Sequence, residues 1–186
     1  MIAHTYTHDD LVSRAEKWLR NTKRYGVVLT ECHGEVEQPD AIAWKYSGRE
    51  SAVVECKVTR SDFLADQKKT HRNHSSKFQL GRYRWYMVPR DLITADEVPD
   101  GWGLLYVRGR RVTIEVDAPR HSEIGWQMEM GLLVSELRKF QIVLGGGNLL
   151  PSASTSRIQS CLSRVLHPLI ASISEDEDAD SNNHDN

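Results

Sequence analysis

The chain has 186 residues, of which 39% are apolar, and this is enough to bury one sizeable hydrophobic core. No apolar run approaches the roughly eighteen residues of a membrane span, and the N-terminus lacks the apolar region of a signal peptide. The three cysteines are odd in number and far apart, which argues against a disulfide framework and for a reducing compartment. We therefore expect a cytoplasmic protein with no membrane segment.

The formal net charge of −2 is unevenly distributed along the chain. Residues 174–186 contain six acids and no Lys or Arg, so the remainder of the chain is net positive. A polar acidic segment of this kind cannot bury apolar surface, and we expect it to be a disordered tail. Residues 1–150 are expected to form one domain, and residues 151–173 a C-terminal helical extension.

Two elements are predicted before the first motif. Residues 9–21 predict a helix, because Asp9 and Asp10 favour a helix N-terminus and apolar residues recur on one side of it. Residues 26–30 (GVVLT) predict a first strand, since β-branched residues dominate this short apolar run.

The next two segments predict a β-hairpin. Residues 40–46 follow Pro39, which is tolerated at the first position of a strand. Residues 51–58 (SAVVECKV) are rich in valine and predict the partner strand. The turn residues Ser47 and Gly48 lie between the two segments, as a hairpin requires.

Three charged side chains converge in this hairpin. Pairing brings Asp40 toward the end of the second strand, where Glu55 and Lys57 leave the same face because side chains alternate along a strand. Val54 and Cys56 leave the other face, so the strand is expected to be buried on both sides. Charges there are costly unless something uses them, whereas on an exposed face Glu55 and Lys57 would form only a weak ion pair. Two carboxylates beside an ammonium group predict a site for a hard cation.

The chain continues with further elements of an α/β fold. Thr59 lies three residues before Asp62, a capping pattern that predicts a helix over residues 59–69. Residues 82–88 predict another strand, which Pro89 ends. The order of helix, three strands, helix and strand predicts a mixed sheet with helices packed against it.

A second hairpin and a long helix are predicted toward the C-terminus. Residues 101–117 predict the hairpin, with its turn around Gly109. Apolar residues then recur with spacings of four and three up to Gly145, where the helix is expected to stop. This stripe consists of Trp126, Met130, Leu133, Leu137, Phe140 and Leu144. We expect it to pack against the sheet, and a homodimer seam is the alternative.

The pair Pro39-Asp40 and the triplet Glu55-Cys56-Lys57 together resemble the signature of the PD-(D/E)xK nuclease superfamily, whose fold many restriction enzymes, resolvases and repair nucleases share. The resemblance covers roughly residues 9–110, and the segments after the motif resemble mostly uncharacterised phage and bacterial members. It implies a restriction-endonuclease-like αβββαβ core, in which a mixed central sheet is flanked by helices and followed by a hairpin and helices.

The resemblance also implies roles for the motif residues. Asp40, Glu55 and the backbone carbonyl of Cys56 would coordinate Mg²⁺, with Mn²⁺ as an alternative. Lys57 would orient or help to deprotonate a metal-bound water, and lysine suits this role because its pKa can be lowered near other cations. In resembling nucleases an acid from the first helix often completes the site. Glu16 is the candidate, unless it is a solvated helical residue. Its rivals are Glu31, Glu35 and Glu37.

A basic stretch follows the motif directly. Between Lys57 and Arg90 the basic residues face only two acids, and aromatic residues are interleaved. This composition suits a polyanion, although a basic solvated face is the simpler alternative. The candidate nucleic-acid contacts are Arg60, Lys68, Lys69, Arg72, Lys77, Arg82 and Arg84.

These features predict a Mg²⁺-dependent endonuclease that hydrolyses phosphodiester bonds of DNA. With no separate sequence-reading module, a structure-specific, repair, recombination or phage role is favoured over cleavage at a long sequence. Two alternatives from other classes stay open. One is a catalytically inactive nuclease-fold protein that binds DNA without metal. The other is an accessory or inhibitor protein that binds a partner through its C-terminal segments.

Overall fold

The computed structural model of the protein describes residues 5–33, 37–68 and 79–145. The chain divides into two compact units, Met1–Leu137 and Arg138–Asn186. Of the second unit, the structure describes only the end of one helix. The predicted divisions after residues 150 and 173 therefore lie outside the described residues, as does the predicted acidic tail.

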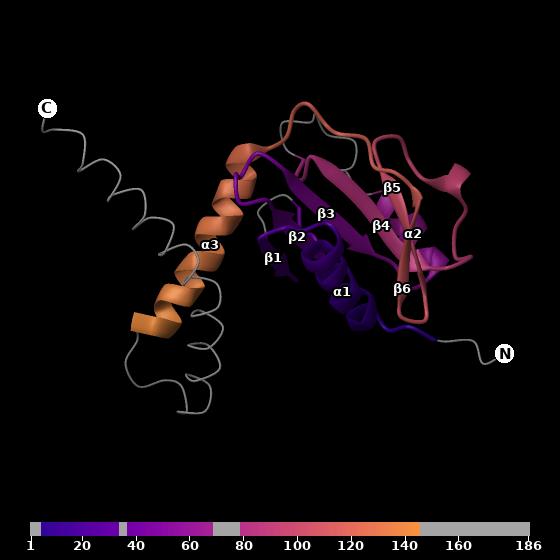
Figure 1. Ribbon diagram of the computed structural model, residues 1–186, viewed down its shortest axis with the longest axis horizontal. Helices are drawn as coiled ribbons and strands as arrows, with labels where there is room; N and C mark the ends of the chain where they lie inside the picture. The colour runs from indigo at the N-terminus through magenta and orange to yellow at the C-terminus, as the bar shows by residue number, and fades with distance from the viewer. Residues whose placement is uncertain (1–4, 34–36, 69–78, 146–186) are drawn as a thin grey trace, which may run out of the picture. The chain divides into compact units, whose positions relative to one another are not determined.

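The first unit is an α/β structure whose elements follow the predicted order (Figure 1). The elements are α1 (His8–Lys17), a π-helical turn η1 (Trp18–Thr22), β1 (Val27–Thr30), β2 (Ala41–Trp44), β3 (Ser51–Cys56), α2 (Arg60–Gln67), β4 (Tyr83–Pro89), a 3₁₀ turn η4 (Ala95–Glu97), β5 (Gly103–Arg108), β6 (Arg111–Val116) and α3 (Trp126–Gly145). The last of these continues into the second unit.

The six strands form one mixed sheet in the order β1-β2-β3-β4-β5-β6. The pairs β1–β2, β2–β3 and β5–β6 are antiparallel, whereas β3–β4 and β4–β5 are parallel. Because β3, β4 and β5 run in the same direction, their last residues share one end of the sheet. We call this the carboxyl end of the sheet, and it carries the candidate site.

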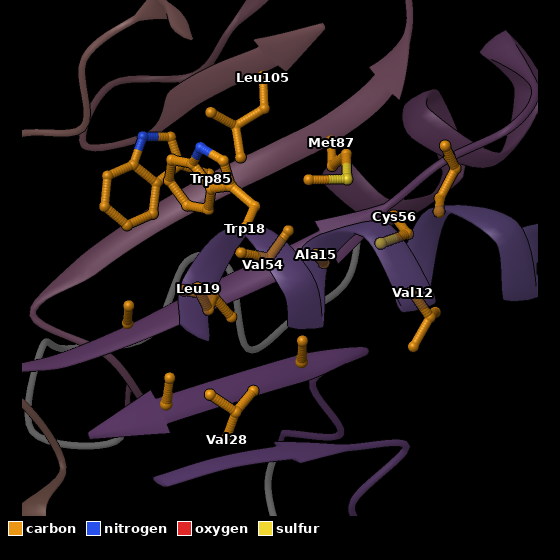
Figure 2. Packing of buried hydrophobic residues seen from close by; sticks show 14 of the residues in the cluster. Val12, Ala15, Trp18, Leu19, Val28, Val54, Cys56, Trp85, Met87 and Leu105 are labelled. Carbon is orange, nitrogen blue, oxygen red and sulfur yellow. The ribbon is translucent and has the colours of Figure 1, made fainter. Parts of the chain in front are cut away.

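Helix α1 lies across one face of the sheet (Figure 1). Figure 2 shows the apolar side of α1, with Val12 and Ala15, and Leu19 of η1 directed at the strands, where Val54 and Trp85 meet them. Leu19 and Val54 are fully buried. Burying an aliphatic side chain of this size contributes about 1.5–3 kcal/mol, so this layer fixes the position of α1 on the sheet.

The first helix begins one residue before the predicted start, at His8, and ends in the π-helical turn η1. Thr7 is the N-cap and forms a capping box with Asp10. At the other end, the backbone N–H of Lys23 reaches the carbonyl of Trp18, which is an i→i+5 bond. Trp18 and Leu19 are adjacent and both buried, and the ring of Trp18 meets that of Trp85 edge to face at 5.2 Å.

The opposite face of the sheet is covered by two smaller clusters. In one, Phe63 of α2 packs against Tyr86 and Leu104 from the middle of the sheet. The second lies over β2 and β3 and includes Val53 and, from α3, Leu132. The strand β3 is therefore buried on both faces along its whole length, as the sequence predicts.

Two boundaries differ from the predicted ones near the motif. Strand β3 ends at Cys56, so Lys57 stands just past it, although its backbone N–H still donates to the carbonyl of Met87. Helix α2 begins after Thr59, whose hydroxyl caps the N–H of Asp62. Both differences place Lys57 on a short link of fixed geometry between β3 and α2.

The predicted stripe of the long helix is wrong for three of the four residues whose side chains are described. Trp126, Met130 and Leu137 are exposed, whereas Leu133 is partly buried and packs against the cluster over β2 and β3. Among the described side chains, the buried residues of α3 are Leu132 and Glu129. The Glu129 carboxylate accepts hydrogen bonds from the Trp44 indole, the Ser51 hydroxyl and the Gly81 N–H. These polar contacts help to determine which side of α3 packs against the sheet. Across the described residues, no helix is both long and apolar enough to cross a bilayer.

Candidate active site

The β2–β3 hairpin brings Asp40 and Glu55 together as the sequence predicts. Ala41 is paired with Val54 in the antiparallel ladder, so Asp40, one residue earlier, stands opposite Glu55, one residue later. The backbone N–H of Cys56 donates to Oδ2 of Asp40 at 2.6 Å. This bond fixes one carboxylate oxygen, while the other, Oδ1, is 3.5 Å from Nε2 of His8.

Lys57 lies among three carboxylates at the carboxyl end of the sheet. Its Nζ is 2.9 Å from Oε2 of Glu55, 3.7 Å from Oδ2 of Asp40 and 3.4 Å from Oδ1 of Asp66. Glu55 and Asp66 are almost fully buried, and the Lys57 side chain is 10% exposed. The predicted triad of Asp40, Glu55 and Lys57 is therefore one cluster, with an additional acid.

Asp66 is the member that sequence reasoning missed. It comes from α2, three residues after the buried Phe63, so it lies on the side of the helix that faces the sheet. The hydroxyl of Tyr86, a residue of β4 paired with Glu55, donates to its Oδ2 at 2.9 Å. This helical spacing was the available signal, because Asp66 is one of only two acids in the basic stretch.

The charges of the cluster shift the pKa of Lys57 opposite to the direction expected. Burial alone would lower it, but the carboxylates of Glu55, Asp40 and Asp66 outweigh burial and raise it well above its usual range. Lys57 is therefore a permanent ammonium ion in this arrangement. Burial and the neighbouring Glu55 carboxylate raise the pKa of Asp40, and Lys57 offsets that only in part.

A second group of ligand atoms adjoins Asp40 on its other side. Nε2 of His8, in the first turn of α1, is 3.2 Å from Oε1 of Glu31 and 3.5 Å from Oδ1 of Asp40. The ligand atoms of these three residues all lie within 4.8 Å of one another. His8 was not foreseen from the sequence, and Glu31 was a rival for the completing acid.

Glu31 adopts a backbone conformation that supports a special role. Its φ is 53°, in the left-handed region that non-glycine residues seldom occupy, and its N–H donates to the carbonyl of Asp40 at 3.1 Å. Strain of this kind persists where surrounding contacts over-determine it, and such positions cluster at functional sites. Two carboxylates and an imidazole fit a divalent cation by their donor chemistry.

The other candidates for the completing acid lie elsewhere or are outside the described residues. Glu16 is part-exposed and accepts a hydrogen bond from Arg20 at 3.0 Å, which matches the solvated alternative. Glu37 is buried and pairs with Arg84. Glu35 lies outside the described residues.

The Cys56 side chain belongs to the core under α1 (Figure 2), on the face of β3 opposite Glu55 because side chains alternate along a strand. Burial, with the nearby Asp40 and Glu55 carboxylates, raises the pKa of its thiol well above the usual value. The side chain is thus a structural thiol, and the backbone carbonyl of Cys56 stays a predicted ligand.

The predicted nucleic-acid contacts are in several different environments. Arg84 is a correction: it is 1% exposed, pairs with Glu37 and stacks over Trp102, so it cannot meet a phosphate. Arg82 donates to the backbone carbonyls of Arg49, His121 and Ser122. Arg60 is exposed but pairs with Glu97, and Lys68 is exposed. Lys69, Arg72 and Lys77 lie outside the described residues.

Comparison with known proteins gives the fold alone. No family model matches the chain, and no curated protein matches it. The solved structure of the SPO1766 protein of unknown function from Silicibacter pomeroyi is similar, with a TM-score of 0.56 and 19% sequence identity. The match covers 80% of this chain and 99% of the other. The architecture of this chain therefore recurs in a protein of another sequence.

Proposed function

We propose that the protein is a Mg²⁺-dependent nuclease that hydrolyses phosphodiester bonds in DNA. The observation that carries the proposal is the meeting of Asp40, Glu55 and Lys57 at the carboxyl end of the sheet, with Lys57 2.9 Å from Glu55 and 3.7 Å from Asp40. A compact group of carboxylates beside an ammonium ion is suited to binding a divalent cation next to a phosphate.

The proposed fold family is the restriction-endonuclease-like core. Its support is the order α1, β1, β2, β3, α2, β4 around a sheet in which β3 is central and β4 runs parallel to it. The motif residues stand on the β2–β3 hairpin and just beyond it, which is where the resemblance to PD-(D/E)xK nucleases requires them.

The proposed metal ligands are Asp40, Glu55 and the carbonyl of Cys56. His8 and Glu31 are close enough to Asp40 to complete the ligand set, and we propose them in place of Glu16. The bound cation would lower the pKa of a coordinated water and offset charge on the scissile phosphate. Because imidazole joins carboxylate oxygens here, Mn²⁺ fits as well as Mg²⁺.

Lys57 would act in this site as a fixed positive charge. The Glu55, Asp40 and Asp66 carboxylates raise its pKa, so Lys57 is protonated at neutral pH before a cation binds. It can donate hydrogen bonds to a phosphate oxygen and stabilise the negative charge that grows there. Asp66, held by Tyr86, positions the ammonium group and makes no contact with substrate.

The test is incubation of purified protein with single-stranded, duplex and branched DNA, with and without Mg²⁺ or Mn²⁺. Asp40→Asn and Lys57→Ala should each lower the cleavage rate by about 10²- to 10³-fold or more. The matched control is Asp62→Asn on the exposed side of α2, which should cut at the wild-type rate. Preference among the three DNA forms tests the proposed structure-specific role.

Two outcomes would contradict the proposal. Equal cutting by the wild type and Lys57→Ala would assign the activity to other residues or to a contaminant. DNA binding that needs no metal and is never followed by cleavage would favour the catalytically inactive DNA-binding alternative.

A further inference from the structure

We propose that a groove between α1 and the β5–β6 turn binds the sugar-phosphate backbone of the nucleic acid beside the scissile bond. This inference rests on the proposed nuclease function and names the surface that holds its substrate. It differs from the sequence-based expectation, which placed the contacts after the motif, on α2 and the segment that follows it.

The groove has the residue types that bind phosphate. Its volume is about 480 Å³, and α1 and η1 form one wall while the β5–β6 hairpin forms the other. Three cationic side chains line it: Arg14, Lys17 and Arg110. Ser13, Asn21 and Thr22 add hydroxyl and amide groups, which together with Arg and Lys supply most contacts to nucleic-acid backbones.

Of the residues described, only one acid, Asp10, lines the groove beside three cations, so the lining keeps a net positive charge. Asp10 accepts hydrogen bonds from the N–H and the hydroxyl of Thr7, because it belongs to the capping box of α1. Its carboxylate is thus turned toward the start of the helix. The positive charge of Arg14, Lys17 and Arg110 remains available to a polyanion.

Arg14 is held for such a ligand by its packing. Its guanidinium carbon lies 5.3 Å from the centroid of the Tyr6 ring, and its Nε is buried with no hydrogen-bond partner among the described residues. A stacked guanidinium keeps its remaining N–H groups in a fixed fork, which suits a phosphate oxygen.

One wall of the groove, the β5–β6 turn, lies at the same end of the sheet as the candidate site. Strand β5 is parallel to β4 and β4 to β3, so the turn after Arg108 lies at the carboxyl end of the sheet with Lys57. The N–H of Gly109 in this turn donates to the Tyr6 hydroxyl at 2.7 Å, and Tyr6 is two residues before His8. Arg108 and Arg111 are exposed beside the groove and extend its positive edge.

The experiment compares two triple variants that lose equal charge. The groove variant carries Arg14→Gln, Lys17→Gln and Arg110→Gln. The control variant carries Arg24→Asn, Arg49→Gln and Arg120→Gln, three exposed residues that do not line the groove. Binding of a fluorescent duplex is followed by anisotropy in Ca²⁺ across a salt series, and circular dichroism checks that each variant is folded.

The logarithm of the DNA-binding constant falls linearly with the logarithm of the salt concentration, and each neutralised phosphate adds about 0.9 to the steepness of that fall. We therefore expect the groove variant to lose roughly two to three units of slope and about 10- to 100-fold in affinity at 0.1 M salt. The control should lose little of either. Equal losses in both variants, or a larger loss in the control, would overturn the inference.

Cleavage by the wild type separates this inference from the proposed function. If the wild type cuts DNA and the groove variant binds and cuts as well as the control, the groove is not the substrate surface but the nuclease proposal stands. If the wild type binds DNA through the groove and never cuts it, the binding surface stands and the nuclease proposal fails.

Discussion

Two buried clusters of charged side chains in this protein differ in the ratio of positive to negative groups. Arg84 and Glu37 form a one-to-one pair, with Trp102 stacked on the guanidinium at 4.3 Å and the Leu80 N–H donating to the carboxylate. Around Lys57, one ammonium group meets three carboxylates. The positive and negative charges of the first cluster are equal. The second carries an excess of negative charge, which a bound cation would neutralise.

This contrast indicates which buried charges serve structure and which serve function. A balanced pair needs only its own hydrogen bonds to offset the cost of leaving water. Burial, followed by the neighbouring Glu55 carboxylate, raises the pKa of Asp40, so the fold is less stable than it would be with a neutral side chain there. Costs of this kind are usually tolerated where the chemistry requires them.

Removing the positively charged side chain from each cluster should change protein stability more than any other substitution proposed. The response of the two variants to Mn²⁺ should differ. Arg84→Met leaves Glu37 buried and unpaired, and the free energy of unfolding should fall by about 3–5 kcal/mol. Lys57→Ala should also destabilise the protein in EDTA, but Mn²⁺ should restore its stability because the carboxylates can bind the ion. Urea unfolding of both variants with and without Mn²⁺ measures this. Recovery of the stability of Arg84→Met in Mn²⁺ would contradict the conclusion that only the cluster around Lys57 binds a divalent cation.

A divalent cation should stabilise the wild type through the unbalanced cluster alone. At a free Mn²⁺ concentration of 100 times Kd, binding to the native state adds about 2.7 kcal/mol to the free energy of unfolding. Asp40→Asn should remove most of this gain, and Glu37→Gln should keep it. Melting temperature against Mn²⁺ concentration is the measurement, and a gain that survives in Asp40→Asn would place the ion elsewhere.

His8 should decide how strongly the site prefers Mn²⁺. His8→Gln should weaken Mn²⁺ binding roughly tenfold or more, and Mg²⁺ binding less, because Mg²⁺ takes oxygen ligands. Titration calorimetry of both ions gives the ratio. His121 provides the control, since its ring bonds the Gly101 carbonyl, so that His121→Gln should leave the ratio unchanged. An equal change for both ions would exclude His8 as a ligand.

Neutralising Asp40 should stabilise the metal-free protein. Because its native pKa is raised above the ordinary value of about 3.9, the native state holds its proton more tightly than the unfolded chain. Stability of the wild type in EDTA should therefore fall as pH rises through the window above 4. Asp40→Asn should remove this fall and add roughly 0.5–2 kcal/mol at neutral pH, the range of single stabilising substitutions. A less stable Asp40→Asn in EDTA would contradict the raised pKa.

Local pattern was sufficient to predict the strands and the hairpin of the site. The valine-rich run around Glu55 and the turn at Ser47 and Gly48 fix the β2–β3 register, which in turn places Asp40 opposite Glu55. Periodicity of two explains why Glu55 and Val54 were assigned to opposite faces correctly.

Contacts between distant segments were not predictable in the same way. His8 meets Asp40 because α1 crosses the sheet, and Glu31 meets it because β1 pairs with β2. No spacing along the chain indicates that His8 lies there. Arg84 was misplaced because its basic neighbours suggested a surface, although it alternates with Trp85 and shares the face of Tyr86. The predicted stripe of α3 was wrong except at Leu133, because the buried contacts of Glu129, a polar residue, lie on the packed side.

The most direct test of the central claim is the anomalous scattering of Mn²⁺ in crystals grown with the metal. We predict a peak bonded to carboxylate oxygens of Asp40 and Glu55, adjacent to Lys57 at the carboxyl end of the sheet. No peak at these carboxylates at saturating Mn²⁺, or one bound only to surface acids elsewhere, would contradict the account.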